Sequence, residues 1–172
     1  MKRGILFLAV VLAVLRIAFF VAPDLYPEEA YYWNYAAHLD IGYLDHPPMV
    51  AWLIHLGTAL FGDGEFGVRA PLILCSIATA FFTFRLTELL FDRRAAWMAV
   101  LLVQLLPFFF LTGFMITPDA PLTAFWSGGL YFLALALLRE KAGAWFGLGV
   151  CLGLGMLSKY TIALLSAKTG WM

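Results

Sequence analysis

Several long apolar stretches, separated by short charged hinges, constrain this chain more than any other feature of its sequence. A helix crosses a bilayer with about 20 apolar residues, and helices satisfy their backbone hydrogen bonds internally in lipid. The chain therefore predicts an all-α, polytopic membrane protein with about five to six transmembrane helices. The predicted spans cover residues 5–22, 68–91, 95–116, 120–138 and 142–157, and a further span begins near residue 160.

The composition agrees with a chain that is solvated by lipid. Of 172 residues, 63% are hydrophobic and 13% are charged, whereas a soluble domain is about half apolar and a quarter charged. The formal net charge is zero, so no basic surface predicts binding to nucleic acid. Cys75 and Cys151 lie singly within apolar stretches, which predicts neither a disulfide framework nor a zinc site.

Basic residues near the span ends predict the orientation of the chain. Lysine and arginine accumulate on the cytoplasmic side of a membrane, and by alternation three basic hinges share one side. These hinges hold Lys2, Arg3, Arg93, Arg94, Arg139 and Lys141. The N-terminus is therefore predicted to be cytoplasmic. Residues 1–172 are predicted to form a single membrane region in which residues 23–67 are an external loop that contacts membrane lipids.

Acidic residues gather on the predicted external side. Carboxylates contribute little to orientation, so their clustering needs another explanation and is the first indication of function. The external acidic residues are Asp24, Glu28, Glu29, Asp40, Asp45, Asp63, Glu65 and Asp119.

The external loop predicts two short helices that lie at the membrane surface. The first follows Pro27 and carries aromatic residues at positions 31, 32, 33 and 35, and such rings settle at the headgroup level. The second runs from Met49 to Phe61. Proline is well tolerated at a helix start, so the prolines before Met49 agree with this boundary.

Four motifs follow one another in the chain: Tyr-Pro-Glu-Glu-Ala-Tyr-Tyr-Trp at 26–33, Gly-Tyr-Leu-Asp-His-Pro-Pro at 42–48, Thr-Pro-Asp-Ala-Pro-Leu at 117–122 and Leu-Ser-Lys-Tyr at 157–160. In this order they resemble bacterial GT-C glycosyltransferases, in particular those related to protein O-mannosyltransferases and the lipid A aminoarabinose transferase. The resemblance implies transfer of a sugar from a polyprenyl-phosphate donor to a glycan, lipid or protein acceptor at the external face of the bacterial inner membrane. Members of that family have more spans, so the chain is expected to be a truncated N-terminal portion.

The implied chemistry needs a carboxylate that takes the proton of an acceptor hydroxyl. Glu28 is the first candidate for this catalytic base, and Asp119 is a second catalytic carboxylate. The family commonly carries Asp-Glu in its first external loop, where this chain has Glu28 and Glu29.

Substrate contacts are predicted for Glu29, Tyr32, His46, Lys159 and Arg69, because cations stabilise a leaving phosphate. Asp45 and His46 offer an oxygen and a nitrogen ligand side by side, which suits a divalent metal or the acceptor. Family members often carry lysine where His46 stands.

Each of these residues also has a structural interpretation. Glu28 and Glu29 suit the positive end of a helix, and Thr117 could cap a helix that has Pro118 in its first turn. Asp45 could cap the second surface helix. Glycines 149 and 153 form a G-x-x-x-G pattern that close helix packing would explain.

Two other classes of protein remain open. A small transporter or lipid-binding protein would carry ionisable residues near the midplane and repeated halves. Among the ionisable residues, Arg16 and Arg85 lie farthest from the ends of the predicted spans, and Arg16 could extend its charge outward to the interface. A non-catalytic assembly subunit is the third possibility.

Overall fold

The structure is a computed structural model that describes residues 14, 18, 23–106 and 113–167, and these residues contain helices and no strand. The all-α prediction is therefore confirmed for this part of the chain. In chain order the elements are α2 (Pro27–Ala37), α3 (Met49–Phe61), α4 (Glu65–Arg69), α5 (Pro71–Leu90), α6 (Arg93–Leu105), α8 (Asp119–Arg139), α9 (Gly143–Ser158), the 3₁₀ helix η1 (Tyr160–Ile162) and α10 (Ala163–Ala167).

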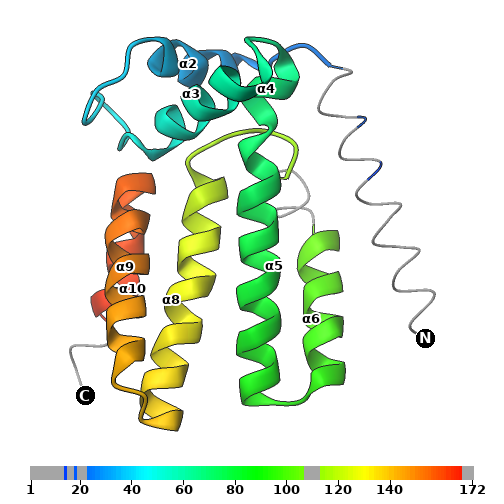
Figure 1. Cartoon of the computed structure of the whole chain (residues 1–172), viewed down its shortest axis with the longest axis vertical. Helices are drawn as coiled ribbons and strands as arrows, with labels where there is room; N and C mark the ends of the chain where they lie inside the picture. The colour runs from blue at the N-terminus through cyan, green and yellow to red at the C-terminus, as the bar shows by residue number, and fades with distance from the viewer. Residues whose placement is uncertain (1–13, 15–17, 19–22, 107–112, 168–172) are drawn as a thin grey trace.

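The helices form two layers (Figure 1). Helices α5, α6, α8 and α9 run side by side as a bundle, in which α5 packs against α6 and α8, and α8 packs against α9. Helices α2, α3 and α4 lie across one end of this bundle, and we call residues 27–69 the cap layer. The two helices predicted within the 23–67 loop are therefore confirmed as α2 and α3.

Among the residues that the structure describes, two helical stretches are long and apolar enough to cross a membrane. They are Glu65–Leu90, with a mean hydropathy of 1.6, and Asp119–Arg139, with 1.5. Helix α9 has 16 residues, and α6 ends at Leu105, before the end of the predicted span 95–116. The predicted span 5–22, including Arg16, lies almost entirely outside the described residues, so the total number of spans stays a prediction.

Two predicted helix caps are wrong. The residue before α8 is Pro118, and no side chain caps this helix, because the N–H of Ala120 bonds to the backbone carbonyl of Thr117 instead of its hydroxyl. Helix α3 likewise begins after Pro48 without a side-chain cap. Its expected cap, Asp45, accepts hydrogen bonds from tyrosine hydroxyls instead.

One apolar core joins the cap layer to the bundle. Its buried members come from α2, α3, α4, α5, the loop before α8 and the start of α8, and they are Tyr32, Ala36, Val50, Ile54, Val68, Leu72, Cys75, Ile116 and Ala120. Burial of apolar area stabilises such a cluster. It therefore holds α2 against the ends of α5 and α8, where the candidate site lies.

The 149–153 glycine pattern makes no close helix contact within the described residues, so its packing role stays a prediction. A Cβ atom at Gly149 or Gly153 would meet nothing within 4 Å in the described part of the chain. The neighbouring glycines face the packed side of α9 instead: a Cβ at Gly147 would lie 2.6 Å from the Phe132 ring, and one at Gly155 would overlap Ile162. The contact is therefore made by the other face of the helix.

Candidate active site

Glu29 and Arg69 form an ion pair that is withdrawn from solvent. Both side chains are 0% exposed; Arg69 Nη2 donates to Glu29 Oε2 at 2.6 Å and Nε donates to Oε1 at 2.9 Å. The guanidinium also donates to the carbonyls of Pro23 at 2.9 Å and Asp24 at 3.0 Å. Buried charges persist when they are paired and hydrogen-bonded in this way. The pair fastens the end of α4 to the beginning of α2.

Glu29 also binds backbone groups from two distant parts of the chain. Its carboxylate accepts hydrogen bonds from the N–H groups of Tyr26 and Ile116, each at 3.1 Å. The second bond joins the first turn of α2 to the loop before α8. Glu28 precedes Glu29, and Asp119 lies three residues after Ile116. The bond between Glu29 and Ile116 therefore fixes the backbone segments that carry the two candidate catalytic carboxylates relative to each other.

A tyrosine network surrounds Asp45. The Tyr35 hydroxyl donates to Asp45 Oδ1 at 2.7 Å and the Tyr31 hydroxyl donates at 3.0 Å, and the two hydroxyl oxygens lie next to each other. The Tyr43 ring stacks on Tyr35 with centroids 4.0 Å apart. Hydrogen bonds from Tyr35 and then Tyr31 lower the pKa of Asp45, so this carboxylate stays ionised.

Tyr32 lies at the centre of the site. Its hydroxyl is 3.4 Å from His46 Nε2, and His46 Nδ1 is 3.1 Å from Asp45 Oδ2. Burial, together with the negative charges of Glu28, Asp45 and Asp119, raises the pKa of Tyr32 to about 12. The hydroxyl therefore stays protonated near neutral pH and serves as a donor.

Asp119 and Lys159 form a second ion pair, which is open to solvent. Lys159 Nζ donates to Asp119 Oδ1 at 2.9 Å, and the side chains are 37% and 30% exposed. The pair joins the first turn of α8 to the residue after α9. Glu28 is exposed and makes no hydrogen bond or ion pair with any described residue, so its carboxylate is free to meet a substrate.

The structure separates the predicted site residues into two groups. One is linked to Tyr32 through contacts and charge interactions, and it consists of Glu28, Tyr32, Asp45, His46, Asp119 and Lys159. The other is the buried pair of Glu29 and Arg69, for which the geometry supports a positioning role. Substrate binding by either residue stays a prediction.

The sequence interpretation missed the tyrosines that hold Asp45. Tyr31 and Tyr35 had been assigned to the membrane interface together with their aromatic neighbours. Their i, i+4 spacing, which places two side chains on the same helix face, was the available signal. Tyr43 carried no such signal, because its contact with Tyr35 depends on how the 38–48 segment folds back on α2.

A metal centre at Asp45 and His46 finds limited support. Within the described residues, no group of three or more His, Cys, Asp or Glu side chains could hold a metal ion. Asp45 and His46 supply two ligands, and the Asp45 oxygens already accept from Tyr31 and Tyr35. The metal therefore stays a prediction and enters no step below.

Comparison with known proteins decides the family. Residues 45–169 match the family described as dolichyl-phosphate-mannose-protein mannosyltransferase. The chain belongs to this family. The resemblance to GT-C glycosyltransferases is therefore confirmed, and the family favours a transferase over a transporter. The matched stretch contains Asp45, His46, Asp119 and Lys159, and it begins after Glu28.

Curated relatives extend the similarity through most of the chain. A lipid A galacturonosyltransferase of Rhizobium johnstonii is 29% identical over 83% of this chain and 30% of its own length. An undecaprenyl phosphate-α-4-amino-4-deoxy-L-arabinose arabinosyl transferase of Edwardsiella ictaluri is 32% identical over 77% of this chain and 25% of its own length. One from Pseudomonas fluorescens is 30% identical over 76% and 23%.

The chain thus spans less than a third of the length of these relatives. No solved structure matches it.

Proposed function

We propose that this chain carries the catalytic carboxylates of a membrane glycosyltransferase that moves a sugar from a polyprenyl-phosphate donor to a glycan, lipid or protein acceptor. The observation that carries the proposal is that the charges of Glu28, Asp45 and Asp119 all act on Tyr32, while Lys159 pairs with Asp119. The names of the relatives support the reaction class, since they specify undecaprenyl-phosphate sugar and lipid A transferases.

The proposed orientation places the N-terminus in the cytoplasm of a bacterium and the cap layer at the external face of the inner membrane. The basic hinges support it through the positive-inside rule. The bundle helices also expose large apolar side chains that suit contact with membrane lipids, among them Leu74, Phe81, Leu102 and Phe146.

The reaction is a direct displacement with inversion at the sugar carbon. A hydroxyl oxygen of the acceptor forms the new bond to the anomeric carbon, and the bond from that carbon to the phosphate oxygen breaks. Glu28 takes the hydroxyl proton, because its carboxylate is exposed and unpaired among the described residues. The electron pair of the broken bond leaves with the polyprenyl phosphate.

Lys159 stabilises the negative charge of that leaving phosphate, since a preorganised cation is worth most where charge develops. Asp119 accepts from Lys159 Nζ at 2.9 Å and so orients the ammonium group. The protonated Tyr32 hydroxyl donates a hydrogen bond at the same site. Glu29 and Arg69 act as positioning residues that hold Glu28 and Asp119 in place.

The test is a sugar-transfer assay in membranes with a polyprenyl-phosphate sugar donor. Glu28→Gln and Asp119→Asn each keep side-chain size and should lower transfer by a factor of about 100 or more. Glu140→Gln, at the opposite end of α8, is the matched control and should leave transfer unchanged. Transfer that survives in Glu28→Gln would remove Glu28 as the base, and a correctly inserted parent chain without transfer would support the non-catalytic alternative.

A further inference from the structure

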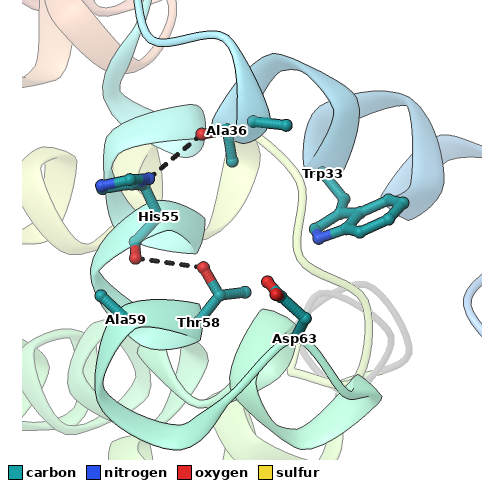
Figure 2. Close-up of a pocket in the computed structure, with 7 residues that line it drawn as sticks. Trp33, Ala36, His55, Thr58, Ala59 and Asp63 are labelled. Carbon is teal, nitrogen blue, oxygen red and sulfur yellow. Dashed lines mark hydrogen bonds between the residues drawn. The ribbon is translucent and has the colours of Figure 1, made fainter.

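A pocket in the cap layer (Figure 2) is lined by none of the residues of the Tyr32 group. It encloses about 370 Å³ between α2, α3 and the turn before α4, which is near the small end of the roughly 300–1,000 Å³ of small-molecule sites. Figure 2 shows the Asp63 carboxylate pointing into the space between the Trp33 ring and Thr58. The size suits one small ring and not an extended chain.

The polar groups of the pocket are mostly acceptors. Thr58 Oγ1 donates its proton to the His55 carbonyl at 3.1 Å, which leaves the oxygen lone pairs as acceptors. Asp63 adds carboxylate oxygens, and Trp33 Nε1, which bonds to no described residue, is a donor. The His55 Nδ1 proton is directed to the Ala36 carbonyl, 3.2 Å away.

Because most polar groups of the pocket are hydrogen-bond acceptors, the pocket disfavours the binding of anions. None of the described residues that line the pocket is lysine or arginine, and a phosphate or carboxylate would face the Asp63 carboxylate without a compensating charge. A ligand rich in hydroxyl or amino protons would meet acceptors instead. An indole also presents a flat apolar face and, to an amino group, a cation–π surface.

The pocket and the Tyr32 hydroxyl both border α2, because Trp33, Ala36 and Ala37 of that helix line the pocket. Consecutive helical residues project about 100° apart, so the Trp33 ring and the Tyr32 ring leave α2 in different directions. Neither Tyr32 nor Lys159 lines the pocket. A sugar in the pocket therefore lies next to the proposed reaction centre but does not occupy it, and the donor phosphate binds near Lys159 instead.

We propose that the Trp33–Asp63 pocket binds one uncharged or amino-bearing sugar ring of the acceptor, beside the ring that receives the transferred sugar. The acceptor assignment rests on the proposed function; the binding of a sugar ring does not.

The experiment is saturation-transfer NMR on the full chain in lipid nanodiscs, with methyl glucoside, methyl glucosaminide and glucose 6-phosphate as probes. The first two should bind and the phosphate should not. Trp33→Leu and Asp63→Asn should each weaken binding by about three- to tenfold. The matched controls are Trp145→Leu, an exposed tryptophan of α9, and Asp24→Asn, an exposed acidic residue just before α2; both should bind as the parent does.

The proposal would be overturned if glucose 6-phosphate bound as well as methyl glucoside, or if methyl glucoside bound unchanged to Trp33→Leu and Asp63→Asn. Displacement of methyl glucoside by the polyprenyl-phosphate donor would overturn the acceptor assignment, because it would place the donor sugar in the pocket. Failure of the two proposals is distinguishable. Transfer without glycoside binding would remove the pocket alone, whereas binding without transfer would leave a sugar site in a chain that lacks the proposed activity.

Discussion

Two carboxylate–cation pairs connect residues that are 40 positions apart in the chain, yet they differ in almost every physical respect. Glu29 and Arg69 are 0% exposed and bind each other and four backbone groups. Asp119 and Lys159 share one hydrogen bond and keep about a third of their surface in solvent. The buried pair directs its hydrogen bonds to the protein itself and so stabilises the fold. The exposed pair has donors and acceptors that still face solvent and can bind a ligand.

Removal of Arg69 should have the largest effect on stability. Arg69→Met would leave the Glu29 carboxylate buried without its cation, which costs about 3–5 kcal/mol in soluble proteins. Chemical unfolding in detergent, followed by circular dichroism, measures the free energy of unfolding. The double variant Glu29→Leu with Arg69→Met should recover much of the loss, because replacement of both charges is often close to neutral. A double variant as unstable as Arg69→Met would mean that the lost backbone bonds dominate.

The second-largest loss of stability should come from disturbing the close contact between α3 and α4, the helix that ends at Arg69. A Cβ at Gly57 of α3 would overlap the Gly67 carbonyl of α4 and lie 2.8 Å from Pro71 Cδ. Gly57→Ala should therefore push α4 away and cost about 1–3 kcal/mol, measured by the same unfolding experiment. Gly149→Ala is the control, since its Cβ meets open space, and it should stabilise α9 by about 0.5–1 kcal/mol. Equal effects in the two variants would contradict the close approach of α3 and α4.

Loss of the exposed pair should change activity much more than stability. Lys159→Met should alter the free energy of unfolding by no more than about 1 kcal/mol, because solvent screens an exposed pair. Sugar transfer should fall strongly, since the leaving phosphate loses its cation. Parallel unfolding and transfer measurements separate the two effects. A variant that unfolds as easily as Arg69→Met would place Lys159 with the structural residues instead.

The smallest expected effect concerns Asp45. Its pKa is lowered from the usual 3.8 by the tyrosine hydroxyls, so the unfolded state binds the proton first as the pH falls. The stabilising contribution is therefore present above the unfolded pKa and is lost as the pH falls through the lower folded value. Thermal unfolding from neutral pH to about pH 3 should show a small deficit in Asp45→Asn that shrinks with acidity. A deficit that is constant with pH would mean that the network does not depend on the charge.

The same contrast shows how far sequence reasoning could go. Glu28, Glu29, Asp119, Lys159 and Arg69 were all selected from the sequence, because their residue types suit a charged substrate. Their pairing was not foreseen, since Glu29 and Arg69 come from different helices and burial depends on how the cap layer closes. Glu28 and Glu29 were both predicted to meet the substrate, Glu28 as the base and Glu29 as a binding residue. Consecutive residues of a helix project about 100° apart, so the two side chains have different surroundings.

The sequence by itself determined the helices and the family. Apolar length and proline positions fix α3 and the long helices α5 and α8 through local rules of propensity and hydropathy, and the ordered motifs carry the relationship to glycosyltransferases. The tertiary structure alone decided which charges are exposed, which tyrosines hold Asp45, and where a sugar-sized pocket opens. Those properties arise from contacts between segments that are tens of residues apart, and neither periodicity nor composition encodes the distance between two side chains.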